Sequence, residues 1–426
     1  MRRLILVPLC LMLTAAPAYA QLRGHGGPVR SVAVSADGQS AISGSFDTSA
    51  IRWSLARNAA EQVLRFHDSA VNAVAIIGSD RQATGGEDGR IAVWKSGNPV
   101  PELTFEGHTA PIVALAVSPD GDTIASASWD RSIRLWPLKG GAPRVLNGHD
   151  QNVNGVAFSR DGRSLVSAAY DASVRIWPLA GGAPVIVTLP TPLNAVAVAP
   201  DGEIVAAGAD GRVYFLGPDG EKRGEVEVAE MPIISVAISP DGTLVAAAGI
   251  RGSVGVIERK ARRLARTLVG PGLPVWSVAF FGDSRTLLTG GTDRMVRRWD
   301  ARTGDHIGTV ALGAVDDPLA AFAGHRGAEV YRACVACHTL SPDEGNRAGP
   351  TLHGVFGRRI ATLPGYDFSP ALKKMDIVWT PETVSRLFEI GPMKYTPGTK
   401  MPEQRVTSAE DRKALVDFLE KATKPK

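Results

Sequence analysis

The sequence predicts two domains of different fold class, an all-β propeller with seven blades followed by an all-α domain. Two observations support this. Residues 24–310 repeat with a period near forty, and each repeat holds short alternating strands separated by polar turns. Residues 326–426 instead carry apolar side chains at helical spacing. We place the propeller at residues 21–311, a linker at 312–325 and the helical domain at 326–426.

The first twenty residues have the pattern of a secretory signal peptide. Two arginines precede an apolar run, and residues 18–20 read Ala-Tyr-Ala, which fits a small-x-small cleavage site. An uncleaved membrane anchor is the alternative, but the apolar run at 4–13 is shorter than the ~20 residues that a membrane span needs. We therefore expect cleavage after Ala20, a periplasmic protein, and no stable membrane span once the signal is removed.

A recurring aspartate in a tight turn marks the repeats, and Arg251 replaces it in the sixth. The spacings between successive positions are 41, 42, 41, 39, 41 and 42 residues. The aspartates are Asp47, Asp88, Asp130, Asp171, Asp210 and Asp293. A period of 40–45 residues is typical of four-stranded propeller blades, so seven repeats predict seven blades.

Each repeat contains the same series of strands. In the third repeat, a first strand at 113–118 leads into the turn Pro119-Asp120-Gly121, where glycine supplies a positive φ. A second strand of small residues follows at 123–128. The third strand ends in an aromatic residue, Trp136, and an outer strand follows at 144–146. This series is the content of one blade.

These units resemble WD repeats, in which a His, a Ser or Thr, an Asp and a Trp form a hydrogen-bonded set inside each blade. The first four units carry the whole set: His25, Ser43, Asp47 and Trp53; His67, Thr84, Asp88 and Trp94; His108, Ser126, Asp130 and Trp136; His149, Ser167, Asp171 and Trp177. The histidines could alternatively form a metal cluster, but their aspartate partners favour a structural role.

The remaining blades are less regular. The seventh keeps Thr289, Asp293 and Trp299 but has no histidine. The fifth and sixth have Ala206 and Ala247 at the hydroxyl position, so we expect apolar packing alone to hold them. The sequence does not show how the propeller ring is closed, because residues 21–24 look too short to form a closing strand alone.

Charge is distributed unevenly. The formal net charge is +4, and from residue 326 to the end there are 16 Lys and Arg against 12 Asp and Glu. The C-terminal part is therefore basic and the central part is not. This modest bias does not indicate nucleic-acid binding.

Helical spacing recurs through the C-terminal domain. Residues 327–335 and 382–389 read as helices, and Ser408 begins a third with a capping-box pattern. An apolar stripe follows at Ala414, Leu415, Phe418, Leu419 and Ala422. We expect an all-α domain.

The motif that organises this domain is Cys334-Val335-Ala336-Cys337-His338, the spacing for covalent haem attachment. Both thiols must reach the two vinyl groups on one porphyrin edge, and the next residue must turn its imidazole onto the iron. A zinc site needs four ligands, and no second cysteine pair is present. A disulfide would leave the adjacent histidine unexplained.

Residues 327–423 resemble a class I cytochrome c, closely the soluble mitochondrial and bacterial carriers. The matching stretches, besides the haem motif, are residues 349–358, 364–368 and 395–402 and the C-terminal helix. The resemblance implies one covalent haem c with His338 as proximal and Met401 as distal iron ligand. Met401 could alternatively fill a gap in the core.

The same resemblance assigns further roles around the haem. The Pro350 carbonyl would accept a hydrogen bond from His338, which would orient the ring. Arg358 and Trp379 would bind the propionates, and Thr399 would support the methionine loop. Tyr366, Phe388 and Tyr395 would pack around the porphyrin. Glu403 departs from the aromatic residue that carriers often have, and Lys373, Lys374, Lys394 and Lys400 could form a basic docking rim.

His/Met ligation fills both axial positions of the iron, which favours electron transfer over chemistry on a substrate. We therefore expect an electron carrier rather than an enzyme, with the propeller as a docking platform for redox protein partners. One alternative is a propeller-based dehydrogenase or reductase with the cytochrome as its electron outlet. Another is a haem-based sensor, which would need an open position on the iron.

Overall fold

The computed structural model describes residues 21–269, 273–307, 319–322, 324–331, 334, 338–341, 349–366, 368–399, 401 and 405–424. All statements about the structure concern these residues. The predicted signal segment, most of the predicted linker, Cys337, Lys400 and Glu403 lie outside them.

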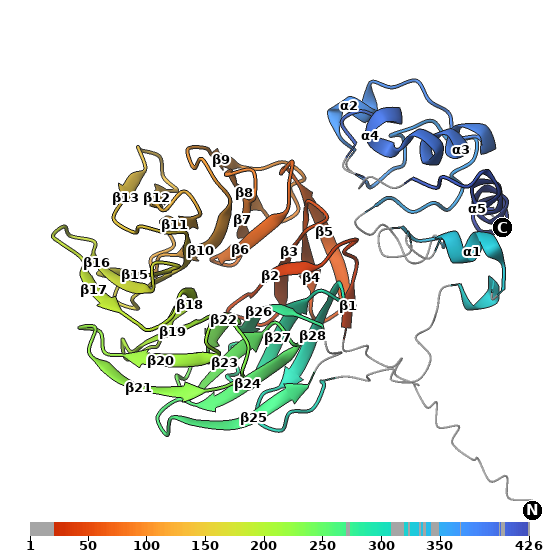
Figure 1. Cartoon of the computed structure of the whole chain (residues 1–426). Helices are drawn as coiled ribbons and strands as arrows, with labels where there is room; N and C mark the ends of the chain where they lie inside the picture. Colours follow the sequence, from red (N-terminus) through yellow and green to blue (C-terminus); the bar gives the residue numbers. More distant parts are fainter. Residues whose placement is uncertain are drawn as a thin grey trace, which may run out of the picture.

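Within the described residues, 28 strands form seven four-stranded antiparallel sheets arranged in a ring (Figure 1), so the predicted seven-bladed propeller is confirmed. Blades 1 to 4 consist of β2 (Val29–Val34), β3 (Ser40–Ser45), β4 (Ser49–Ser54), β5 (Ala59–Arg65); β6 (Val71–Ile77), β7 (Arg81–Gly86), β8 (Ile91–Lys95), β9 (Leu103–Phe105); β10 (Ile112–Val117), β11 (Thr123–Ser128), β12 (Ile133–Pro137), β13 (Arg144–Leu146); β14 (Val153–Phe158), β15 (Ser164–Ala169), β16 (Ser173–Pro178), β17 (Val185–Thr188).

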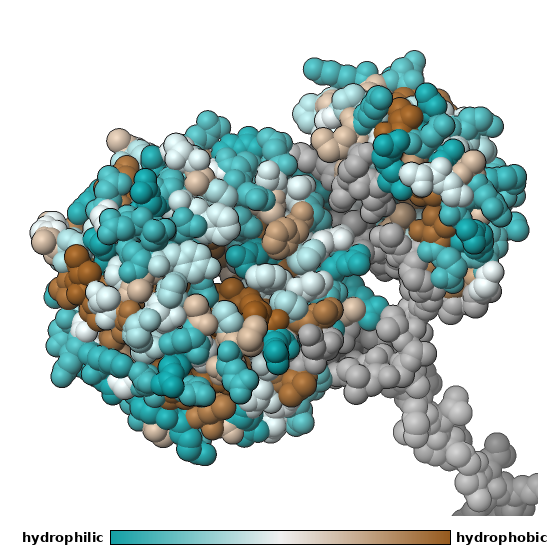
Figure 2. All heavy atoms as spheres, in the orientation of Figure 1, coloured by the Kyte–Doolittle hydropathy of each residue, from teal (hydrophilic) through white to brown (hydrophobic). Residues whose placement is uncertain are grey.

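Blades 5 to 7 consist of β18 (Leu193–Val198), β19 (Ile204–Gly208), β20 (Arg212–Leu216), β21 (Lys222–Glu227); β22 (Ile233–Ile238), β23 (Leu244–Gly249), β24 (Ser253–Glu258), β25 (Arg263–Val269); β26 (Val275–Phe280), β27 (Thr286–Gly291), β28 (Met295–Asp300) with β1 (Gln21–Arg23). The first strand of each blade packs against the first strands of its neighbours, so these strands line the centre of the ring. Figure 2 shows a largely hydrophilic surface with hydrophobic side chains in separate patches.

The ring closes through β1, the outermost strand of blade 7. Its residues pair with β28 in antiparallel register, with Leu22 opposite Val296 (Figure 1). The Leu22 side chain is 1% exposed and packs in a core shared with Val29 and Trp53 of blade 1. The expectation that residues 21–24 are too short to close the ring is therefore wrong. Three residues are enough because one of them is fully buried between the first and last blades.

The predicted hydrogen-bonded sets are present in blades 1 to 4. In blade 1, His25 Nδ1 lies 3.0 Å from Asp47 Oδ2, and His25 Nε2 lies 2.7 Å from Ser43 Oγ. The Ser43 hydroxyl also accepts a hydrogen bond from Trp53 Nε1 at 2.7 Å. A carboxylate only accepts and an indole N–H only donates. The imidazole therefore donates from Nδ1 to the carboxylate, and the serine hydroxyl donates to its Nε2. Both ring nitrogens are engaged, so neither is available to bind a metal ion.

Blades 5 and 6 are not held by apolar packing alone, so that expectation is wrong. In blade 5, the Tyr214 hydroxyl donates to the Asp210 carboxylate in place of the histidine. The buried Arg259 guanidinium then joins blade 6 to blade 5, with Nη1 2.7 Å from Glu203 and Nη2 2.8 Å from Asp201. Glu203 also pairs with Arg262. Charged pairs between blades replace the missing polar sets inside them.

The C-terminal region is helical, as predicted. It comprises the 3-10 helix η1 (Ala320–Phe322), α1 (Arg326–Tyr331), α2 (Pro370–Lys373), α3 (Pro381–Ile390), α4 (Pro392–Tyr395) and α5 (Ala409–Ala422). Ser408 caps α5 by accepting from the Asp411 amide, at the predicted start. Helix α1 crosses α5 at Gly327, where a Cβ would lie 1.9 Å from the Ala414 carbonyl oxygen. The chain therefore needs a glycine at this crossing.

The helices enclose a core of their own, which includes Tyr331, Phe388, Leu415 and Phe418. The predicted stripe on α5 faces this core, since Leu415, Phe418 and Leu419 are buried. No helix in the described part of the chain is both long and apolar enough to cross a membrane.

Candidate functional site

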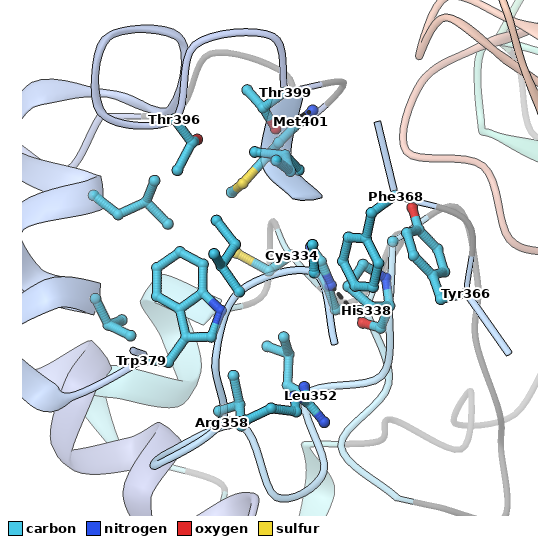
Figure 3. Close-up of a pocket in the computed structure, with 18 of the residues that line it drawn as sticks. Cys334, His338, Leu352, Arg358, Tyr366, Phe368, Trp379, Thr396, Thr399 and Met401 are labelled. Carbon is cyan, nitrogen blue, oxygen red and sulfur yellow. Dashed lines mark hydrogen bonds between the residues drawn. The ribbon is translucent and has the colours of Figure 1, made fainter. Parts of the chain in front are cut away.

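A crevice in the helical region brings together residues from both ends of it. Its cavity volume is about 180 Å³, and it opens to solvent. Most of the side chains that line it are apolar, among them Leu352, Val355, Phe388 and Leu372. Figure 3 shows Cys334, His338, Trp379 and Met401 around the same space.

His338 is held in the crevice by the backbone of a neighbouring loop. Its Nδ1 lies 2.8 Å from the Pro350 carbonyl oxygen, which is the contact that the resemblance implied. Because a carbonyl only accepts, Nδ1 carries the proton of this hydrogen bond. Gly349 makes this approach possible, since a Cβ there would lie 2.3 Å from His338 Cε1.

Met401 reaches the same crevice from the loop before α5. Its backbone N–H donates to Thr399 Oγ1 at 3.1 Å, and the Thr399 amide donates to the Thr396 carbonyl at 3.0 Å. Thr396 is buried and anchors the loop to α4, because its hydroxyl donates to the Pro392 carbonyl. In Figure 3 the Met401 sulfur points into the crevice. Thr399 therefore supports the methionine loop in the way the resemblance implied.

Cys334 is 7% exposed and lines the crevice next to His338. Burial raises the pKa of the Cys334 thiol to about 12, so it is a neutral thiol at physiological pH. The second cysteine of the motif, Cys337, lies outside the described residues. Among these, no three His, Cys, Asp or Glu side chains gather where they could hold a metal ion.

Arg358 and Trp379 lie side by side at the crevice because their backbones pair. The Gly357 amide donates to the Trp379 carbonyl at 2.8 Å, and the Trp379 amide donates to the Arg358 carbonyl at 3.0 Å. The Arg358 guanidinium donates to the His353 and Thr351 carbonyls, both at 3.1 Å. It forms no ion pair within the described part of the chain, and burial lowers its pKa. A half-buried cation without an anion is unfavourable, so this position suits a negatively charged group.

Tyr366 lies at the opening of the crevice. Its ring packs against Phe368 with centroids 4.7 Å apart. Arg65, at the end of β5 in the propeller, lies over the Tyr366 ring with Cζ 5.6 Å from the centroid. Arg65 and Asp47 both border the crevice, so blade 1 of the propeller lies next to its opening.

The crevice does not include every residue assigned to it by resemblance. Phe388 lines it, but Tyr395 packs against the helical core and is absent from the lining. Many lining residues were not singled out from the sequence, among them Gly349, Phe368 and Thr396. Gly349 could have been recognised, because it directly precedes Pro350 within a matching stretch.

These residues fit a covalently held haem. The wall is apolar, as a porphyrin requires, and the half-buried Arg358 guanidinium at its edge could meet a propionate. A histidine oriented through its Nδ1 and a methionine sulfur both enter the crevice, and these are the donor types of a His/Met iron site. Cys334 lies where a thioether bond could form.

Comparison with protein families matches five segments to "WD domain, G-beta repeat": residues 18–54, 59–95, 99–137, 141–178 and 262–300. They contain the strands β2 to β4, β6 to β8, β10 to β12, β14 to β16 and β26 to β28. These strands belong to the blades that keep the serine or threonine, aspartate and tryptophan of the polar set. Blade 5 and the first three strands of blade 6, which lack most of it, lie between the last two matches.

Comparison with curated proteins shows similarity to cytochromes c over a short part of the chain. A cytochrome c of Cochliobolus lunatus is 42% identical over 100 residues, which are 23% of this chain and 92% of that protein. One from Arabidopsis thaliana is 42% identical over 100 residues, 23% of this chain and 88% of the plant protein. "Cytochrome c 2.1" of Caenorhabditis elegans is 42% identical over 98 residues, 22% of this chain and 85% of the relative.

Proposed function

The chain belongs to the cytochrome c family through its C-terminal region, which follows a WD-repeat propeller, and we propose that it is a periplasmic electron carrier with one covalent haem c. The observation that carries the proposal is the crevice that holds His338, Met401 and Cys334 together. A haem bound there supplies an iron that accepts and releases one electron at a time.

The residues of the chain prepare this site for electron transfer. Pro350 fixes the His338 ring and keeps the proton on Nδ1, so that Nε2 can serve as a ligand. Thr399 holds the backbone of Met401. His338 and Met401 would both hold the iron, which would leave no open place for a substrate and favours a carrier over an enzyme.

We propose that the propeller docks the redox partner protein. The Arg65–Tyr366 contact supports this role, because a partner seated on blade 1 would lie beside the opening of the crevice. Lys373, Lys374 and Lys394 are exposed and could form the predicted basic rim. Lys400, the fourth residue of that rim, lies outside the described residues.

Export through the predicted signal peptide is part of the same proposal. Cleavage after Ala20 would make Gln21 the first residue, and β1 begins at Gln21. The closing strand would thus remain intact. The mass of the purified mature chain tests this step, since cleavage beyond Arg23 would remove β1.

The haem proposal is tested by expressing the full chain with its export signal in a host that attaches haem c. We expect the haem to stay with the polypeptide after denaturing extraction and to titrate reversibly with one electron per chain. His338→Ala should abolish the low-spin spectrum. His353→Ala is the matched control, because His353 does not line the crevice, and it should keep the spectrum. A colourless wild-type protein would refute the proposal.

A further inference from the structure

The propeller contributes two charged residues to the lining of the crevice, although the crevice lies in the helical region. Asp47 and Arg65, both from blade 1, border it together with Tyr366 and Arg358. Figure 1 shows β5, which ends at Arg65, on the side of the ring that faces the helical region. A cytochrome c domain without a propeller would lack both residues, so their role is specific to the two-domain chain.

The Asp47 carboxylate is already bound inside blade 1. Its Oδ2 lies 3.0 Å from His25 Nδ1 and accepts from the Gly26 amide at 2.7 Å. Its Oδ1 accepts from the Ser49 amide at 3.0 Å and from the Ser49 hydroxyl at 2.6 Å. Both oxygens are therefore used by the polar set of the blade, and Asp47 serves the fold rather than the crevice.

The Arg65 guanidinium has no such partners. It is partly buried, and its Cζ lies 5.6 Å from the centroid of the Tyr366 ring, which packs in turn on Phe368. Its charge acts on Asp47 through space, without an ion pair between them. It forms no hydrogen bond or ion pair with any residue that the structure describes. The Tyr366 ring thus holds the guanidinium at the opening of the crevice, and its five N–H donors are left for another group.

Three arginines border the described part of the crevice, and two of them have no anion there. Arg359 is paired, because its Nε lies 3.3 Å from Asp376 Oδ1. Arg358, from the helical region, donates only to carbonyl groups, and Arg65, from the propeller, is the second unpaired cation. A haem carries two propionate carboxylates. The crevice therefore offers one unpaired guanidinium for each of the two anions that a bound haem would bring.

We propose that the haem site is shared between the two domains, with Arg65 of the propeller binding one haem propionate and Arg358 the other. A planar guanidinium suits a carboxylate, which it can bind through two parallel hydrogen bonds. The inference rests on the proposed haem c function, and it adds to that function a haem-binding residue supplied by the propeller.

A cation at this position affects the iron electrostatically. An unpaired propionate favours the ferric state, because a nearby negative charge stabilises the more positive iron. Arg65 offsets that charge and thereby favours the ferrous state, so it raises the reduction potential. By linkage, reduction of the iron favours the contact between blade 1 and the helical region by the same factor.

Redox titration of the haem-loaded full chain tests the proposal in wild type and Arg65→Gln. At the wild-type midpoint potential, the ratio of reduced to oxidised haem should be at least about twofold lower in Arg65→Gln, because a unit positive charge is lost near the iron. The resonance Raman bending band of the propionates, which responds to their hydrogen bonds, should shift in the same variant. Arg65→Lys keeps the charge without the planar fork, so it should keep most of the potential and still shift the band.

Arg57→Gln is the matched control, since it removes an exposed arginine of blade 1 that precedes the other end of β5 and pairs with Glu61 at 2.7 Å. It should leave the ratio and the band as in wild type. Thermal unfolding and the low-spin spectrum show whether each variant is folded and holds its haem. The proposal fails if either readout of folded Arg65→Gln matches wild type, or if Arg57→Gln changes both as strongly. A wild-type chain without haem would overturn the proposed function as well, whereas a normal wild-type titration with an unaffected Arg65→Gln would overturn this inference alone.

Discussion

At the scale of single residues, Arg358 shows when an unpaired charge becomes a candidate binding position. It borders the crevice, forms no ion pair among the described residues, and burial lowers the pKa of its guanidinium. Elsewhere the buried Arg259 pairs with Glu203. Arg298 also has a pKa lowered by burial and no ion pair among the described residues, and its guanidinium donates to the Leu55 carbonyl and to Asn58. An unpaired arginine is therefore a candidate position for an anion only where it also borders a cavity, as Arg358 does.

Gly349 gives the sharpest prediction at this scale. In Gly349→Ala, the new methyl group would lie 2.3 Å from the His338 ring, so the ring or the loop must move. We expect a destabilisation of about 1–3 kcal/mol from overpacking, together with a changed haem spectrum. Gly249→Ala, in the propeller, is the control, because the φ of Gly249 is not positive and no atom lies closer than 3.5 Å to its Cβ position, and it should keep the spectrum. An unchanged spectrum in Gly349→Ala would show that Pro350 does not orient the ligand.

At the scale of elements, the blades are held together by polar contacts of two kinds, which are two solutions to the same structural requirement. Blades 1 to 4 bind their third strand to their second through a serine or threonine, as Ser167 does between His149 and Trp177. Blades 5 and 6 rely on Tyr214 and on ion pairs between blades. The first solution repeats at a constant spacing and could be predicted. The second joins Glu203 to Arg259, which have no recognisable pattern in the sequence.

Ser167→Ala tests the first solution. It leaves the Trp177 N–H and His149 Nε2 buried without their partner, which should cost about 1–3 kcal/mol in the free energy of unfolding. The reverse change, Ala206→Ser in blade 5, should not stabilise the protein. Ala206 is fully buried, and blade 5 has neither the histidine nor the tryptophan. A stabilising Ala206→Ser, measured by denaturant unfolding, would contradict this account.

The same set predicts how stability depends on pH. Burial lowers the pKa of His149, so the folded protein holds it neutral, and this contribution is lost as the pH falls below about 6.5. For Asp171, burial raises the pKa, but hydrogen bonds from Ser173 and His149 outweigh it and hold the pKa below its usual value. That contribution is lost below about pH 4. The unfolding temperature should fall from pH 7.5 to 5.5, and less so in His149→Gln.

At the scale of the whole molecule, closure of the ring and the position of the crevice depend on contacts between distant parts of the chain. Leu22 meets Val296, and Arg65 meets Tyr366. Local patterns predict repeats, helices and the haem motif, but not which short segment completes a distant sheet. This is why the sequence predicted the blades correctly and left their closure open. For the same reason it did not reveal that blade 1 borders the crevice.

Leu22→Ala tests the closure. The side chain is buried between the first and last blades, so its loss should cost about 2–5 kcal/mol in the free energy of unfolding. Thr104→Ala, at an exposed position on the outer strand of blade 2, should change stability by no more than about 0.5 kcal/mol. Equal effects of the two substitutions would mean that β1 does not hold the ring together.

The central claim is that His338 and Met401 together fill the axial positions of a covalent haem iron. Adding carbon monoxide to the reduced full-length protein, and recording its absorption spectrum, tests this most directly. We predict a low-spin spectrum that carbon monoxide leaves unchanged, and a shift in Met401→Ala, where one position is open. Rapid binding of carbon monoxide by the wild-type protein would contradict the claim and would favour a sensor or an enzyme.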